Sequence, residues 1–480
     1  MQRKFITNLL LFIGLNLLIK PFYLFGIDRT VQNVVGESTY GIYFALFNFS
    51  LIFNMLLDLG ITNFNNRSVA KSKEFLDEAF SRIFTLKLLL GAFYILFVLI
   101  LGWIVGYNAL QIKLLIPLVI NQFLSSFILY LRSNVSGLLL FKTDGLLSVA
   151  DRLIMIICCG ILLWGNVTDK PFQIEWFVYV QTFAYLATIV FALIVVLRKT
   201  KLRSPFVDFP YFKNILKQCI PFALLALLTN LHNRTDSVFL ERLLPMGTGA
   251  EQAGIYASAF RLLDAGIIIA LLFSVLLLPL FSRMIAEKTS VKSLVKTSFT
   301  LIFIYGIIVA VASYFYSYPL MHLLYDNHVK ASSDVFRILM LSIAPLSATY
   351  IFGTLLTANG NLKQLNIIAF IAMIVNISLN VLLIPYFQAI ASAYVSLFTQ
   401  MSIIVAEIII AWKVFSLDIS KKYIAKLVCF LICTIAAGWA SLQLPFHWIV
   451  NILILLCFCG IFIFAFGLIK PKDVLLLFKK

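Results

Sequence analysis

The sequence predicts an all-α, polytopic membrane protein of about fourteen transmembrane helices. Hydrophobic residues make up 62% of the 480 residues and charged residues only 12%, whereas soluble domains are about half apolar and a quarter charged. Apolar runs of about 18 residues or more recur from end to end, and each can cross a hydrocarbon core of about 30 Å as a helix. The net charge of +17 comes from basic residues scattered through short hydrophilic breaks, which argues against a nucleic-acid-binding domain.

The predicted spans follow one another in order along the chain. The first begins in the basic, apolar start MQRKFITNLLLFIG, which no small-residue cleavage site follows, so we interpret it as an uncleaved membrane helix. The fourteen spans are residues 5–26, 40–62, 84–105, 114–131, 145–164, 175–197, 215–240, 254–280, 298–320, 338–358, 365–385, 389–412, 423–443 and 447–469. Those at 215–240 and 365–385 are the least regular.

The distribution of lysine and arginine predicts the orientation of these spans. When the breaks are numbered alternately from the N-terminus, 28 basic residues, among them Lys87 and Arg132, fall on the N-terminal side and 6, among them Arg29, fall on the other. The positive-inside rule then places the N-terminal side in the cytoplasm. Because the number of spans is even, both termini are expected there.

Sequence matches between the two halves indicate an internal duplication. VGESTYGIY opens the second span with Gly41, and TGAEQAGIY opens the eighth with Gly254, 213 residues later. GLLLFKTDG closes the fourth span and GTLLTANG closes the tenth. Six spans separate the copies, so both halves cross the membrane in the same direction. We expect two six-helix lobes that face each other across a cleft, followed by two extra helices. The predicted divisions are residues 1–200, 201–415 and 416–480.

Three lysines at the very start of a span, Lys87, Lys217 and Lys426, are counted with the adjoining breaks. Four basic residues fall deeper inside predicted spans: Lys20, Arg152, Arg234 and Arg261. A charge at the centre of a membrane helix costs about 2.5–3.5 kcal/mol on insertion scales, so such residues are functional candidates. In the seventh span a polar strip lies opposite an apolar strip, as in helices that line a wet cavity. The polar strip comprises Thr229, Asn230, Asn233, Arg234, Ser237 and Glu241, with Asp236 at its edge.

These cations predict a binding site for an anion, with phosphate the best match. Lysine and arginine hold phosphate through charge-assisted hydrogen bonds. The expected substrate-binding residues are Lys20, Arg234 and Arg261, with Asn230 and Asn233. The acidic neighbours Asp236 and Asp264 would keep the empty cavity near neutral or carry a coupling ion.

Each of these cations also has a structural interpretation. Arg234 can pair with Asp236 or Glu241, and Arg261 can pair with Asp264, solely to hold helices together. Lys20, which we expect towards the outer end of its span, can extend its ammonium to the membrane surface.

Four further titratable residues are open to two interpretations. Arg152 stands beside Asp151 near the cytoplasmic end of span five, where an interfacial position is expected. Asp58 is expected to cap a helix or pair with a cation. Glu407 is either a proton or sodium site or an interfacial residue, and His232 is either a titrating group or a structural one.

No signature of an enzyme or a metalloprotein is found in the sequence. The seven cysteines lie within or beside apolar runs, away from histidines, so we predict no metal site. A GxxxxGK[ST] nucleotide-binding loop is lacking, and no cofactor or catalytic residue is predicted. YDNHVKASSD (325–334) is interpreted as a solvated loop.

The N-terminal segment 20–70 resembles the start of the Wzx-type polysaccharide flippases. These belong to the multidrug/oligosaccharidyl-lipid/polysaccharide (MOP) exporter superfamily. The resemblance lies in the GIY opening of span two, the Leu-Gly pair at 59–60, and Arg67 with Ala70. The stretch NRTDSVFLERLL…GIYASAFRLLDAG and the GTLLTANG loop are similar to the same family, so the resemblance covers most of residues 5–415.

The resemblance implies transport of an undecaprenyl-diphosphate-linked oligosaccharide across the bacterial inner membrane by alternating access, with proton or sodium countertransport. Related lipid II flippases engage the diphosphate with cations on their first and eighth helices, and Lys20 and Arg261 match those positions. A lysine at position 20 keeps the charge but lacks the fork of a guanidinium. The implied partners are the lipid-linked oligosaccharide, H⁺ or Na⁺, membrane lipid and other polysaccharide assembly proteins.

Two other functions compete with this hypothesis. A multidrug antiporter of the same superfamily would favour carboxylates and aromatic residues in its cavity, and usually twelve spans. A membrane polysaccharide polymerase or ligase would carry a sizeable extramembrane loop, whereas the longest breaks here, 63–83 and 198–214, are about 20 residues each and face the cytoplasm. The sugar carried, the coupling ion and the oligomeric state are left open by the sequence.

Overall fold

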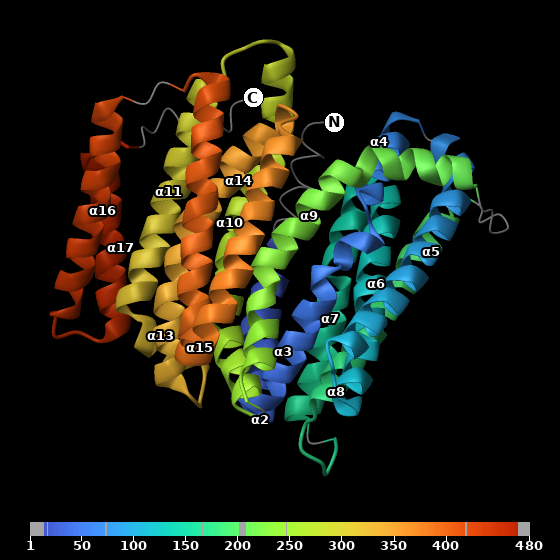
Figure 1. The fold of residues 1–480 in the computed structure, drawn as a ribbon, viewed down its shortest axis with the longest axis horizontal. Coiled ribbons are helices and arrows are strands. Elements are labelled where there is room, and N and C mark those ends of the chain that lie inside the picture. The colour runs from blue at the N-terminus through green and yellow to red at the C-terminus, as the bar shows by residue number, and fades with distance from the viewer. Residues whose placement is uncertain are drawn as a thin grey trace. The chain divides into compact units, whose positions relative to one another are not determined.

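The computed structural model describes residues 14–16, 18–72, 74–165, 167–200, 208–245, 247–417 and 420–468 (Figure 1). These residues form helices joined by short turns, which confirms the predicted all-α fold class. The chain divides into two compact units, Met1–Gly254 and Ile255–Lys480. The lobe boundaries inferred from the repeat stay a prediction, and the start of the first span lies outside the described residues.

Ten described helices are long and apolar enough to cross a membrane. They are α5 (Glu74–Ile104), α6 (Ala109–Gly137), α7 (Phe141–Trp164), α8 (Ile174–Leu197), α10 (Thr248–Ala286), α11 (Lys292–Phe315), the run of α13 (Val329–Leu339), η3 (Met340–Ser342) and α14 (Ile343–Ala358), α15 (Leu362–Phe415), α16 (Lys421–Leu442) and α17 (Trp448–Ala465). The other predicted spans are the first helix, a broken second helix, the charged α9 (Phe209–Leu243) and a second crossing within α15.

The first helix continues well beyond residue 26, where its hydropathy falls. A π-helix, η1 (Tyr23–Asp28), runs into α2 (Arg29–Val35), and Gly36 ends it with a φ of 79°. The apparent polar end is buried, because Asp28 is inaccessible to solvent and accepts a hydrogen bond from the Tyr40 hydroxyl at 3.1 Å.

This extension corrects two sequence predictions. Lys20 lies fifteen residues before Val35, about 22 Å along a helix axis, and is therefore not near the outer end of its span. Arg29, which we assigned to an outer loop, is part of α2. Hydropathy alone placed the helix end too early because it does not detect buried polar contacts.

The second span is a broken helix. It consists of α3 (Glu37–Ile52), the short 3₁₀ segment η2 (Asn54–Leu57) and α4 (Ile61–Lys71). Leu59 and Gly60 have φ values of 48° and 84° at the break. A left-handed leucine is unfavourable, so surrounding contacts must hold this turn in place.

Lys87 of α5 provides those contacts. Its ammonium donates to the Leu57 carbonyl at 2.8 Å, Asp58 Oδ1 at 2.6 Å and Ser126 Oγ at 3.1 Å. Asp58 also accepts hydrogen bonds from the backbone amide and hydroxyl of Thr62 at the start of α4. Asp58 therefore caps and pairs, as predicted, whereas Lys87 is buried and not in the cytoplasmic break to which we assigned it.

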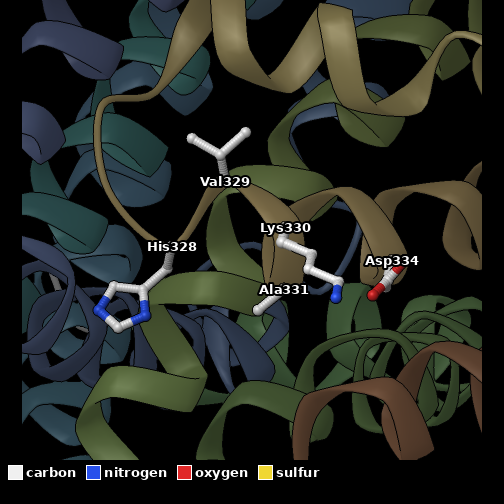
Figure 2. Close-up of a pocket in the computed structure, with 5 residues that line it drawn as sticks. All are labelled: His328, Val329, Lys330, Ala331 and Asp334. Carbon is white, nitrogen blue, oxygen red and sulfur yellow. The ribbon is translucent and has the colours of Figure 1, made fainter.

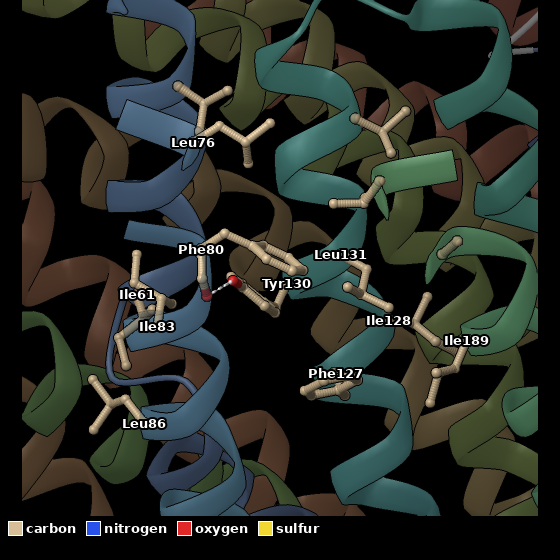
Figure 3. Close-up of a cluster of buried hydrophobic side chains, with 14 of the residues drawn as sticks. Ile61, Leu76, Phe80, Ile83, Leu86, Phe127, Ile128, Tyr130, Leu131 and Ile189 are labelled. Carbon is tan, nitrogen blue, oxygen red and sulfur yellow. Dashed lines mark hydrogen bonds between the residues drawn. The ribbon is translucent and has the colours of Figure 1, made fainter. Parts of the chain in front are cut away.

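The core of the first unit lies between α4, α5, α6 and α8 (Figure 3). Phe80 of α5 faces Tyr130 of α6, with ring centroids 6.2 Å apart, and Ile83 of α5 lies beside Ile61 of α4 (Figure 3). The Tyr130 hydroxyl donates to the Phe80 carbonyl at 3.1 Å, so the polar atom of this ring is satisfied within the apolar layer. The paired apolar faces place α6 in the middle of the unit, in contact with α3, α4, α5, α7 and α8.

The two repeated GIY segments contact each other within the first unit. A Cβ on Gly41 would lie 1.8 Å from the Ala250 carbonyl oxygen, and one on Gly254 would lie 2.1 Å from the Glu37 carbonyl oxygen. The contact is reciprocal in the 213-residue register, since 37 corresponds to 250 and 41 to 254. Glycine is therefore required at both repeat positions so that the two backbones can approach.

In the second unit α15 is two antiparallel segments. Gln388 has a φ of 55° and a ψ of −139°. Ser392 donates to Asn380 Oδ1 at 3.0 Å, although twelve residues of straight helix would separate them by about 18 Å. The chain therefore reverses at Gln388, which agrees with separate spans eleven and twelve.

Candidate functional site

Three basic side chains gather where the first helix meets the end of α6 and the first half of α7. We call Lys20, Arg132 and Arg152, with Asp144 and Asp151, the cationic cluster. Arg132 Nε lies 2.8 Å from Asp144 Oδ1, and Arg152 Nε lies 3.6 Å from Asp151 Oδ2. Lys20 interacts electrostatically with Arg132, Arg152 and Asp151. Three positive charges face two negative ones, which leaves one positive charge in excess.

The surrounding contacts fix this cluster in the first unit. Asn16 donates to Ser148 Oγ at 2.9 Å, which ties the first helix to α7. The guanidinium carbon of Arg152 stacks 4.6 Å from the centroid of the Tyr23 ring, and Tyr185 of α8 lies beside it. Tyr23 begins the π segment of the first helix, and such segments often occur at functional sites.

The arginines keep hydrogen-bonding capacity for a ligand. A guanidinium carries five N–H donors, and the carboxylate contact of each arginine uses its Nε. Arg152 Nη1 makes a weak contact with Met155 Sδ at 3.5 Å. Arg152 also has a hydrogen bond with the Tyr185 side chain. The N–H groups that remain on the two guanidinium groups can bind phosphate oxygens.

Lys20 is a charge of the cluster that has no ion-pair partner within the described residues. Its side chain is exposed, and within the described ranges no hydrogen bond or ion pair to its ammonium is found. An ammonium held near two arginines without its own carboxylate raises the electrostatic energy of the empty site. An added anion would lower that energy.

Arg152 packs against aromatic rings, and its position at the membrane interface stays a prediction. Its stacking on Tyr23 and its position beside Tyr185 place it among buried rings inside the first unit. Sequence reasoning missed Arg132, because that residue stands near a predicted helix end. The available signal was the position of Arg152 eight residues after Asp144 on α7, two turns along the helix.

The polar strip of α9 is used partly for packing against α3. Asn48 donates to Ser237 Oγ at 3.0 Å, and Asn230 Nδ2 lies 3.5 Å from the Leu51 carbonyl. His232 is buried, and its Nδ1 lies 3.0 Å from the Leu228 carbonyl one turn earlier. This contact supports the structural interpretation of His232.

The far end of α9 is joined to the start of α6. We call Tyr107, Gln111, Glu241 and Arg242 the α6–α9 knot. Gln111 donates to Glu241 Oε1 at 2.6 Å and accepts from Arg242 Nη2 at 2.8 Å. Arg242 lies 2.8 Å from Glu241 Oε2 and stacks 4.1 Å from the Tyr107 ring centroid. Glu241 is thus engaged by Arg242 and Gln111, and not by Arg234.

The other predicted binding residues are placed as follows. Asn233 and Arg234 are half-buried, Asp236 is buried, and each interacts with a neighbour. The structure brings Lys20 together with Arg132 and Arg152 and does not bring it into contact with Arg234. Arg261 and Asp264 of α10 are half-buried, and each interacts with another residue.

Glu407 is buried within the second unit. Its side chain is 4% exposed. It faces Gly353 of α14, where a Cβ would lie 3.1 Å from Glu407 Oε1. Glu407 Oε2 has no hydrogen-bond partner among the described residues.

A buried polar cluster at the reversal of α15 was not predicted. Asn380 Nδ2 donates to the carbonyl and side-chain oxygens of Asn376 at 3.1 Å each, and Ser392 donates to Asn380. All three residues are fully buried. Their positions 376, 380 and 392 share a face only after the chain reverses, which the sequence does not reveal.

A shallow hollow of about 460 Å³ lies at the start of α13 (Figure 2). It is lined by His328, Val329, Lys330, Ala331 and Asp334. The segment 325–334, which we interpreted as a solvated loop, is helical from Val329 onward. In the described part of the chain, no group of three histidine, cysteine or acidic residues is arranged to hold a metal ion.

The fold matches those of solved membrane transporters. Lipid II flippase MurJ in an inward closed conformation aligns with a TM-score of 0.74 at 14% identity, over 96% of this chain and all of that one. An inward-facing multidrug resistance MATE family transporter of the MOP superfamily aligns at 0.62 and 13% identity, over 82% and 94%. A MOP superfamily transporter from Pyrococcus furiosus aligns at 0.59 and 14% identity, over 85% and 94%. No curated protein matches the chain.

Two family models match the sequence itself. The MatE model matches residues 221–382. The model described as polysaccharide biosynthesis protein matches residues 25–285, which is more than half of the chain. The chain therefore belongs to the polysaccharide biosynthesis protein family.

Proposed function

We propose that this protein flips an undecaprenyl-diphosphate-linked oligosaccharide repeat unit from the inner to the outer leaflet of the bacterial cytoplasmic membrane. The observation that carries the proposal is the cationic cluster, which holds one positive charge in excess within a membrane-spanning unit. Membership of the polysaccharide biosynthesis family supports the substrate class, and the fold shared with a lipid II flippase supports the mode of transport.

The diphosphate is the part of this substrate that the cluster suits. Each phosphate offers oxygens to the guanidinium groups of Arg132 and Arg152 and to the ammonium of Lys20. Charge-assisted hydrogen bonds of this kind contribute about 1.5–3 kcal/mol each. The basic-residue distribution places α6's end and α7's start on the cytoplasmic side, where a newly made lipid-linked substrate would be met. Arg234 and Arg261, with Asn230 and Asn233, are proposed to receive the substrate later in the cycle.

Transport is proposed to occur by alternating access between the two lobes, coupled to an inward flow of H⁺ or Na⁺. Asp236, Asp264 and Glu407 are the candidate coupling residues. In the proposed topology both termini are cytoplasmic, and the chain has no enzymatic role.

A multidrug antiporter is the second candidate, and the MatE match over residues 221–382 favours it. A site for organic cations needs net negative or aromatic surroundings, whereas the cationic cluster would repel a cation. Binding of undecaprenyl diphosphate in preference to a cationic dye by the purified protein would support the flippase, and the reverse preference would support the antiporter.

A complementation experiment tests the proposal in cells. A strain whose surface polysaccharide depends on this protein would receive Lys20→Ala, Arg132→Ala, Arg152→Ala, Arg234→Ala or Arg261→Ala. We expect Lys20→Ala and Arg152→Ala to abolish surface polysaccharide at normal protein levels. The control is Lys113→Ala, which removes an exposed lysine outside the cluster. Full polysaccharide production by all five alanine variants of these basic residues would contradict the proposal.

A further inference from the structure

Glu407 is a buried carboxyl group that has no ion-pair partner in the described part of the chain. It lies on the second segment of α15 and is 4% exposed. Burial of an ionised carboxylate without a partner is costly, so such groups are found paired, neutralised or in functional use. No cation of the described residues lies within ion-pair distance of it, and Oε2 lacks a hydrogen-bond partner.

The neighbouring helix is shaped around this carboxyl. Gly353 of α14 leaves room for it, because a Cβ there would lie 3.1 Å from Oε1 and 3.8 Å from Oε2. The buried hydroxyl of Thr349, one turn earlier on α14, is beside the carboxyl. A glycine and a threonine one turn apart thus form a small polar chamber around Glu407.

The charged and titratable groups of the surrounding elements do not neutralise Glu407. The elements that pack against α15 are α13, η3 and α14. On α14 the titratable group is Tyr350, and η3 has none. On α13 the charged groups are Lys330, Asp334 and Arg337, which precede Gly353 by sixteen or more residues, about 24 Å or more along a helix. On α15 itself the titratable groups besides Glu407 are Lys363, Tyr386, Tyr394 and Lys413, and none of them forms an ion pair or hydrogen bond with Glu407 within the described residues.

Polar residues lie on both sides of Glu407 along the chain. Buried Ser396 and Gln400 lie eleven and seven residues before it on the same helical face. In the other direction, α15 ends at Phe415, eight residues or about 12 Å further along. That end precedes Lys421, Lys422 and Lys426, which mark it as the predicted cytoplasmic end.

We propose that Glu407 is a reversible proton-binding site through which proton movement is coupled to transport. The coupling part of this inference rests on the proposed function, whereas the proton binding does not depend on it. In the step, a carboxylate oxygen of Glu407 takes up one proton from water, and the same proton returns to water when the conformation changes. No other atom is transferred. Glutamine at this position imitates the protonated carboxyl and cannot release a proton.

The first experiment measures protonation directly, without substrate. The full-length protein in proteoliposomes is titrated while infrared spectroscopy records the carbonyl stretch of a protonated carboxylic acid. We expect a pH-dependent band that is lost in Glu407→Gln and retained in Glu287→Gln, whose carboxylate is exposed and paired with Arg283. Glu407→Asp should keep a shifted band, and Gly353→Ala should shift the wild-type band because its Cβ crowds Oε1. A wild-type spectrum without a band that depends on Glu407 would overturn the proposal.

The second experiment measures coupling in the same proteoliposomes. Flipping of a fluorescent undecaprenyl-diphosphate-linked sugar is followed with and without a pH gradient. We expect the gradient to accelerate flipping by the wild type and by Glu287→Gln, and to have no effect on Glu407→Gln. An undiminished response in Glu407→Gln would overturn coupling through this residue. A wild type that shows the band but does not flip the lipid would contradict the proposed function and still support the proton site.

Discussion

Two lysines of the first unit, Lys87 and Lys20, differ in the hydrogen-bond and ion-pair partners of their ammonium groups. The ammonium of Lys87 is 2% exposed and donates to Leu57, Asp58 and Ser126 at 2.6–3.1 Å. Lys20 is exposed and lies near two arginines without a carboxylate of its own. The same residue type is therefore structural where every donor has a fixed partner, and available for a ligand where the partner is lacking.

Arg242 of the α6–α9 knot is intermediate between Lys87 and Lys20 in how fully its charge is paired and buried. Arg242 has a carboxylate, an amide oxygen and an aromatic ring as neighbours, although it is more exposed than Lys87. Its position joins two helices at one end of the unit. We expect the contribution to the stability of the fold to decrease from Lys87 to Arg242 to Lys20. We expect the contribution to transport to increase in the same order.

Replacement of Lys87 should have the largest effect on stability. Lys87→Ala leaves Asp58 and the Leu57 carbonyl without their partner at the break of the second helix, and removal of one member of a buried pair costs about 3–5 kcal/mol. Thermal denaturation of the purified protein in detergent should show a marked fall in Tm, with reduced protein in the membrane. Lys113→Ala is the control and should leave Tm unchanged. An unaltered Tm for Lys87→Ala would remove the distinction on which the comparison rests.

Replacement of Arg242 should have an intermediate effect. Arg242→Ala removes a charged hydrogen bond to Gln111 and the stacking on Tyr107, for a loss of about 1–3 kcal/mol. The same thermal assay should give a Tm between those of Lys87→Ala and the wild type. A fall as large as that of Lys87→Ala would mean that the knot, and not the helix break, limits the stability of the unit.

Replacement of Lys20 should have the smallest effect on stability and a large effect on transport. Lys20→Ala removes no hydrogen bond or ion pair within the described residues, so its stability change should stay within about 0.5 kcal/mol. Flipping of a fluorescent lipid diphosphate in proteoliposomes should nevertheless be lost. Lys20→Arg should retain activity because it keeps the charge. Normal flipping by Lys20→Ala would contradict a role for Lys20 in substrate binding.

The sequence predicts the membrane helices well and the partners of their charges poorly. Hydropathy and the GIY repeat are local patterns, and the structure places both repeated glycines at one backbone contact. The end of the first helix was wrong because Asp28 is stabilised by Tyr40, a contact that arises only in the folded unit. Lys87 and Arg132 were assigned to cytoplasmic breaks for the same reason, since helix boundaries hide residues that turn inward.

Binding of undecaprenyl diphosphate without its sugar tests most directly whether the cationic cluster is the diphosphate site. Native mass spectrometry of the full-length protein in detergent would measure its affinity for undecaprenyl diphosphate. We predict that Lys20→Ala and Arg152→Ala each weaken binding by about 10-fold or more, as expected for loss of a charge-assisted hydrogen bond of about 1.5–3 kcal/mol, while Lys113→Ala binds like the wild type. Equal affinity in all four proteins would contradict the assignment of the cationic cluster as the diphosphate site.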